Sequence, residues 1–250
     1  MNFFQALNIK KRTVISLVGG GGKTTTMFAI AKEAKLKGYK TVLTTTTKIF
    51  YPDEHTHDIL LTESSLNLLA DIKNKLRASN EIVVGTSRTE DGKLLGINAN
   101  CMSLFFEAGA DIVLCEADGS AGKSFKGEAD HEPVIPSICD TIIHVTGVDC
   151  YNQPISHEYV HRPEIIANVA NVPIGAPLND EVISTLLVHS KGYKASLTNQ
   201  CQWVPFINKV DSSDQLVTAQ KIAECLRNKI DCKVLIGAAV NSDPIIKVLR

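Results

Sequence analysis

A run of glycines followed by a lysine and three threonines is the part of this chain best suited to chemistry. Glycine backbone can turn several N–H groups toward one point and lets phosphate oxygens approach closely. In such a loop the lysine reaches the β- and γ-phosphate oxygens, and the first hydroxyl ligates Mg²⁺. We therefore expect a nucleoside triphosphate, ATP or GTP, to bind with Mg²⁺ at Gly19, Gly20, Gly21, Gly22, Lys23, Thr24 and Thr25.

The glycine spacing differs from the standard phosphate loop. In GxxxxGK[ST] the first glycine would stand at position 17, which is Leu17. Gly19-x-x-Gly22-Lys23-Thr24 is similar to the shorter loop of the Mur ligases and folylpolyglutamate synthase. Read as Gly19-Gly20-x-Gly22-Lys23-Thr24, it is similar to the loop of the SRP/MinD-type NTPases. Many of the latter carry a further lysine where this chain has Val18, so that lysine's role is not carried over.

Two acids follow an apolar run, Ile112–Cys115, and supply the carboxylates that a phosphate loop needs beside Mg²⁺. Glu116 closes the run, and we expect it to hold the metal together with Thr24. Asp118 lies two residues on and shares its side-chain direction, so it is suited to hold metal or to orient an attacking water. The predicted catalytic residues are Lys23, Glu116 and Asp118.

A second motif, Asn208-Lys209-Val210-Asp211, follows another apolar run. In GTPases the aspartate of NKxD accepts the N1–H and N2–H₂ of guanine, and the lysine stem packs on the base. The hypothesis that Asn208, Lys209 and Asp211 read a guanine base competes with the interpretation of a polar turn.

Alternating β-branched runs and helical periodicity predict the elements that position these residues. The pattern indicates a three-layer α/β P-loop domain over residues 1–250 with a mainly parallel sheet. Strands are expected at 13–18, 40–45, 81–85, 111–116, 140–146, 203–207 and 233–238, and helices at 24–37, 63–78, 100–108, 163–170, 179–189 and 213–229. Residues 147–200 are a candidate helical insertion or subdomain, and the Asp91-Gly92 pair predicts a hairpin turn.

Composition narrows the class of protein. The net charge is −1 and basic residues are spread along the chain, which argues against nucleic acid or a membrane surface as partner. Seven cysteines without a CxxC pair favour reduced thiols and a cytoplasmic location. The first residues lack the basic-then-apolar layout of a signal peptide. No apolar run approaches about 18 residues, so we expect no transmembrane helix.

Taken together, the motifs resemble the YqeC family, accessory proteins of selenium-dependent molybdenum hydroxylases. The resemblance spans most of the chain and rests on Leu17–Thr25, Thr44–Ile49, Glu116–Ser120, Ala129–Pro136, His161–Glu164 and Asn208–Asp211. It implies a role in maturing the hydroxylase, with the hydroxylase or its cofactor as partner.

The leading hypothesis is a Mg²⁺-dependent NTPase, and two alternatives stay open. The Mur-like loop favours an ATP-dependent ligase or kinase, whose acceptor would lie beside the polar loop 118–132. A nucleotide switch or chaperone would bind without hydrolysis and change shape for a partner.

Overall fold

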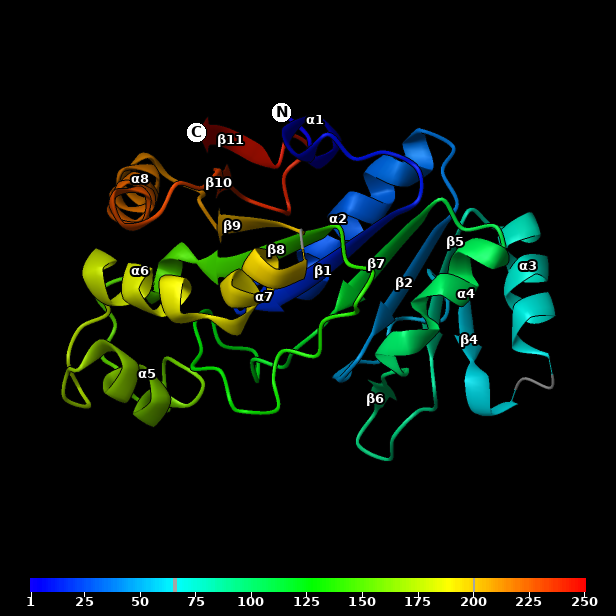
Figure 1. The fold of residues 1–250 in the computed structure, drawn as a ribbon, viewed down its shortest axis with the longest axis horizontal. Helices are drawn as coiled ribbons and strands as arrows, with labels where there is room; N and C mark the ends of the chain where they lie inside the picture. Colours follow the sequence, from blue (N-terminus) through cyan, green and yellow to red (C-terminus); the bar gives the residue numbers. More distant parts are fainter. Residues whose placement is uncertain (65–66, 200) are drawn as a thin grey trace.

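A computed structural model describes residues 1–64, 67–199 and 201–250. Its centre is a nine-stranded sheet in which β11 is antiparallel to β10 and the other neighbours are parallel (Figure 1). Across the sheet the order is β11 (Ile245–Leu249), β10 (Val234–Gly237), β9 (Gln202–Asn208), β8 (Thr141–Gly147), β1 (Thr13–Gly19), β7 (Ile112–Glu116), β2 (Thr41–Thr45), β5 (Glu81–Gly85) and β4 (Ile59–Leu61). The prediction of an α/β domain with a mainly parallel sheet is confirmed.

Helices cover both faces of the sheet and make the fold three-layered (Figure 1). The helices are α1 (Phe3–Leu7), α2 (Lys23–Leu36), α3 (Leu68–Ala78), α4 (Met102–Glu107), α5 (Pro163–Ala170), α6 (Asp180–His189), α7 (Lys191–Asn199) and α8 (Ser213–Lys229). Short 3₁₀ turns lie at Thr62–Ser64, Ala99–Cys101 and Val148–Cys150.

Alternating side chains of the strands divide the core between the two faces. In β1, Ile15 and Leu17 pack in one cluster with α1 and α2. Val14 belongs to a cluster with α3 and α4, and Val18 to one with α5, α6 and α8. Residues from the 147–200 segment therefore share a hydrophobic core with β8 and β9.

The phosphate-loop strand lies in the middle of the sheet. β1 pairs with β7 on one side, with Leu17 opposite Glu116, and with β8 on the other, with Gly19 opposite Val145. Because these strands are parallel, their carboxyl ends meet at one edge, and ligands of open α/β sheets bind in the crevice there. The glycine loop, the two acids at the end of β7 and the Asn208 motif at the end of β9 are brought to this edge.

Several elements differ from the sequence prediction. The helix expected over 63–78 begins at Leu68, and part of that stretch, residues 65–66, lies outside the described residues. The Asp91-Gly92 turn is present, with a bridge between Arg88 and Leu94, but the strand after it leaves the main sheet. This strand, β6 (Lys93–Leu95), pairs with β3 (Lys48–Phe50) in a separate two-stranded sheet.

Short elements at the edges were missed. They are α1, β3, β4, β11 and α7, the last of which follows α6 after Ser190. Within 1–64, 67–199 and 201–250, no helix combines the length and the apolar character needed to cross a bilayer.

Candidate functional site

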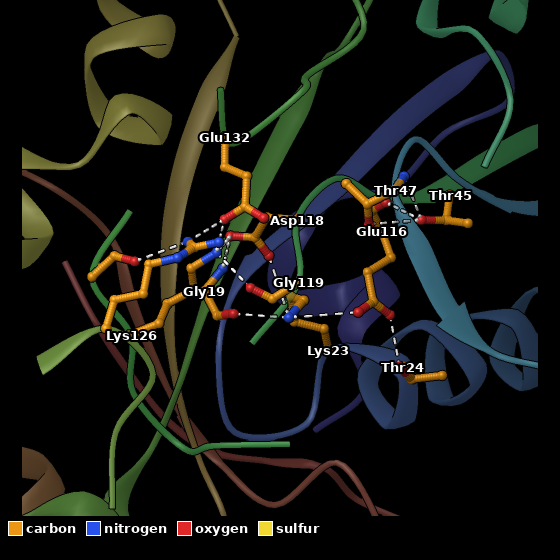
Figure 2. A network of polar contacts seen from close by, with 12 residues as sticks. Gly19, Lys23, Thr24, Thr45, Thr47, Glu116, Asp118, Gly119, Lys126 and Glu132 are labelled. Atoms are coloured by element: carbon orange, nitrogen blue, oxygen red, sulfur yellow. Dashed lines mark hydrogen bonds and ion pairs between the residues drawn. The ribbon is translucent and has the colours of Figure 1, made fainter. Parts of the chain in front are cut away.

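Lys23 is the centre of a buried charged cluster at the carboxyl edge of the sheet (Figure 2). Its Nζ donates to the Gly19 carbonyl at 2.8 Å. The same ammonium lies 3.5 Å from Glu116 Oε1 and 3.3 Å from Asp118 Oδ1. The structure therefore brings together the three residues predicted to be catalytic.

The hydroxyl of Thr24 donates to Glu116 Oε2 at 2.7 Å. Thr24 is in the first turn of α2 and Glu116 is the last residue of β7, so neighbouring strand ends position the pair. A hydroxyl and a carboxylate are oxygen donors of the kind that Mg²⁺ prefers. The donor set predicted for the metal is thus assembled, and its chemistry fits a hard cation.

Burial and charge set the ionisation of the cluster. Burial lowers the pKa of the Lys23 ammonium, but the fields of Asp118 and Glu116 outweigh it and raise this pKa above its ordinary value. Burial also raises the pKa of Glu116, and the opposing field of Lys23 does not fully compensate. The Lys23 ammonium is therefore harder to deprotonate than a free lysine, and the Glu116 carboxyl group is harder to ionise than a free glutamate.

The glycine loop uses most of its own amides internally. The Gly19 N–H donates to Asp118 Oδ2 at 2.9 Å, the Gly20 N–H to the Val145 carbonyl, and the Gly21 N–H to the Lys123 carbonyl. Within α2, the first helical bond comes from the Thr26 N–H to the Gly22 carbonyl. The amides free for an anion are therefore those at the start of α2 rather than those of the first three glycines, which differs from the sequence expectation.

Close approach of neighbouring chain requires glycine in this loop. Gly19 has φ of +92°, and a Cβ there would lie 2.3 Å from the Val145 carbonyl oxygen. At Gly22, with φ of +113°, a Cβ would meet Asn208 Nδ2 at 2.6 Å. Side chains at these positions would displace the loop from β8 and β9.

A second buried lysine, Lys126, holds Asp118 from the other side (Figure 2). Its Nζ lies 3.1 Å from Asp118 Oδ2 and 2.6 Å from Glu132 Oε2, and it donates to the Gly119 carbonyl at 2.6 Å. Arg162 donates to the same Glu132 oxygen at 2.6 Å. Burial opposes ionisation of Glu132, but hydrogen bonds from Arg162 and Lys126 lower its pKa to about 2.

A cavity of about 620 Å³ opens in front of the phosphate loop. Its lining includes Gly21, Gly22, Lys23, Thr24, Thr25 and Glu116. Four further lysines contribute, namely Lys48, Lys93, Lys123 and Lys209. A cavity of this size with so many ammonium groups suits a polyanion of nucleotide dimensions.

Asn208 ties the phosphate loop to the end of β10. Its Nδ2 donates to the Gly21 carbonyl at 2.8 Å, and its Oδ1 accepts the Ala239 N–H at 2.9 Å. Lys209 lines the same cavity and its Nζ lies 2.8 Å from Asp149 Oδ2. Asp211 is exposed and lines a different cavity of about 390 Å³ that includes Asn241.

Sequence reasoning missed the part that Lys126 and Glu132 play. Both stand in the polar loop expected to be functional, but no spacing rule pairs a loop lysine with an acid that follows β7. No signal in the sequence distinguishes Lys126 from a solvated loop lysine.

Comparison with known proteins identifies the family. The model of the family described as YqeC protein matches residues 15–164, more than half of the chain. The chain belongs to the YqeC family. A relative from Escherichia coli (strain K12), described as uncharacterized protein YqeC, is 27% identical over 219 residues, which cover 87% of this chain and 84% of that protein.

The YqeC match includes most of the charged cluster. Lys23, Glu116, Asp118, Lys126 and Glu132 all lie within the matched residues 15–164, and so does Arg162. The Asn208–Asp211 motif lies beyond the matched range. The resemblance expected from the sequence is confirmed at the level of the family.

Proposed function

We propose that this YqeC family member is a Mg²⁺-dependent nucleoside triphosphatase. The observation that carries the proposal is the convergence of Lys23, Thr24, Glu116 and Asp118 at the start of α2, in a lysine-lined cavity. Phosphoryl transfer from a triphosphate is catalysed mainly by positioning and charge neutralisation, and these residues provide both.

The roles follow from the contacts. Lys23 would neutralise the β- and γ-phosphate oxygens, moving from the Gly19 carbonyl that it now contacts. Thr24 and Glu116 would hold Mg²⁺, which when bound supplies further neutralising charge. The Asp118 carboxylate lies between two lysines and is suited to orient a water toward the γ-phosphate.

We further propose a preference for guanine. Asn208 joins the phosphate loop to the segment after β10, so the loop and the base site would be one rigid unit. Asp211 follows within the same turn and presents an exposed carboxylate, which accepts from two adjacent donors of guanine and would meet an acceptor at N1 of adenine.

The test is a thermal-shift panel of GTP, ATP and their diphosphates with Mg²⁺. Binding to the native state stabilises it in proportion to ln(1 + [L]/Kd), so preference appears as an ordered set of shifts. We expect GTP to give the largest shift in the wild type, and Asp211→Asn to remove the difference between GTP and ATP. Equal shifts in the wild type would contradict the guanine preference.

Turnover separates hydrolysis from its alternatives. We expect Mg²⁺-dependent phosphate release from GTP that Lys23→Ala abolishes, with Lys32→Ala, an exposed lysine on the same helix, as matched control. Tight binding without release, together with nucleotide-dependent capture of a hydroxylase, would favour a switch instead. A Lys23→Ala variant with wild-type turnover would rule out the assignment.

A second candidate, a kinase or ligase, is favoured by one further cavity. This cavity of about 400 Å³ shares Lys48 and Gly119 with the triphosphate cavity and is lined by Thr46, Thr47 and Glu132. An acceptor bound there would lie next to the γ-phosphate. Phosphate transfer only when a small acceptor is added would identify this activity.

The cellular role that we propose is maturation of selenium-dependent molybdenum hydroxylases in the cytoplasm. It is supported by the family resemblance and not by a contact in this site. Hydroxylase activity should fall in cells that carry the Lys23→Ala variant in place of the wild type, and unchanged activity would contradict the role.

A further inference from the structure

A second cavity, of about 720 Å³, lies behind the loop that carries Lys126. It is enclosed by that loop, by β8, by α5, and by the end of α6 with the start of α7. Its volume falls in the range of sites that enclose small organic ligands. The triphosphate function proposed above makes no use of it.

One part of the cavity wall is apolar. It is formed by Phe125, Ile165, Val169, Leu186 and Leu187. Such a surface favours the apolar body of an organic molecule, because burial of that body removes it from water.

The floor of the cavity is polar, and some of its hydrogen-bonding atoms have no partner among the described residues. His144 and Lys126 lie there, each about 5% exposed or less. His144 Nδ1 and Glu128 Oε1 are buried and have no hydrogen-bond partner among the described residues. Buried polar atoms are nearly always paired in native proteins, so these two indicate a place where a further molecule completes the bonding.

Basic side chains lie at the rim of the cavity. They are Lys191 and Lys194, with His131 and His189 beside them. Of the acids that also line the cavity, Glu164 is paired with His157 at 2.8 Å and Asp130 lies 3.8 Å from Lys191 Nζ, while burial raises the pKa of Glu128 to about 7. Lys194 lines the cavity without an ion pair among the described residues, which favours an anionic group on the ligand at this position.

We propose that this cavity binds a small organic anion, with its apolar body between α5 and α6 and its anionic group at Lys194. The site is separate from the triphosphate site, and the proposal does not depend on nucleotide hydrolysis.

The test uses 2-naphthoate as probe and its uncharged analogue 2-naphthamide, titrated calorimetrically into the nucleotide-free protein. We expect saturable binding of one naphthoate. Naphthamide should bind the wild type about threefold more weakly than naphthoate, and Lys194→Gln should bind naphthoate about threefold more weakly than the wild type. Lys221→Gln, an exposed lysine on α8, is the matched control and should leave the affinity unchanged.

Filling the cavity should weaken naphthoate binding. Val169→Trp places bulk inside it, and Asn168→Trp does so from an exposed lining position that tolerates substitution. Both should lower naphthoate affinity more than about tenfold, while Val217→Trp on the surface of α8 should not. Circular dichroism confirms that each variant is folded.

Three results would overturn the proposal. They are the absence of saturable naphthoate binding at millimolar concentration, wild-type affinity in both cavity-filling variants, and equal affinity for naphthoate and naphthamide. Lys23→Ala should keep its naphthoate affinity, so failure here and failure of the triphosphatase assignment are separable.

Discussion

At the scale of single residues, the hydroxyl of Thr24 gives the sharpest test of the metal assignment. Thr24→Val keeps the shape of the side chain and removes the donor to Glu116. Because hydrogen bonds to charged groups contribute about 1.5–3 kcal/mol, we expect Mg²⁺-dependent nucleotide affinity to fall at least about tenfold. Calorimetric titration of GTP at several Mg²⁺ concentrations measures this, and Thr24→Ser should recover most of the loss. An unaltered Mg²⁺ dependence would contradict the role.

Glu132 provides a pH test at the same scale. Its pKa falls from 4.5 to about 2 in the folded chain, since Arg162 and Lys126 favour the ionised form. A lowered folded-state pKa stabilises the protein above the unfolded value, and this contribution is lost as pH falls from about 4.5 to 2. We expect Glu132→Gln to cost about 2 kcal/mol at pH 7 and to lose less stability than the wild type in that acid window. Urea unfolding across pH 2–7 tests both expectations, and parallel curves would refute them.

At the scale of the element, the strand–loop–helix unit depends on the backbone of Gly19. A Cβ there meets a backbone oxygen at 2.3 Å, whereas at Gly38 it meets nothing within 4 Å, although both have positive φ. Gly38→Ala should therefore cost only the strain of a left-handed alanine, about 1 kcal/mol. Gly19→Ala adds a clash that requires β8 to move, and we expect about 3 kcal/mol or more. Urea denaturation of the two variants compares them, and equal costs would show that the loop yields easily.

Central elements could be predicted from the sequence because burial leaves a strong pattern. β1, β7 and β8 are buried on both faces, and such strands appear as continuous apolar runs. Edge elements carry no such pattern. β4 and β3 have three residues each, and α7 begins two residues after α6 ends, so periodicity does not separate them.

The candidate site divides in the same way. Lys23, Thr24 and Glu116 were predicted because local spacing and parallel strand ends determine where they lie. The contact of Lys126 with Asp118 depends on the path of a long loop, and loop conformation is set by tertiary packing rather than by periodicity. The internal use of the glycine amides was missed for the same reason.

At the scale of the whole molecule, the two ends of the chain are joined beside α1. The Met1 ammonium donates to the Ile245 carbonyl, and the Ile245 N–H donates to the Met1 carbonyl. Phe3 is fully buried with its ring centroid 5.3 Å from that of Phe206. Phe3→Ala should cost about 3–5 kcal/mol, while Leu36→Ala, which is 82% exposed, should change stability by less than about 0.5 kcal/mol. Chemical denaturation measures both values, and a small loss for Phe3→Ala would show that α1 is dispensable.

The loop between β7 and β8 forms a wall common to three cavities, since its residues from Gly119 to Val134 contribute to each. A ligand on one side of such a wall that shifts Lys126 changes the free energy of binding on the other side. By thermodynamic reciprocity the two effects are equal, so each ligand would report the occupancy of the other. Lys126 is the residue that connects the two sites, because it lines one cavity and contacts the Asp118 carboxylate, which also lies beside Lys23.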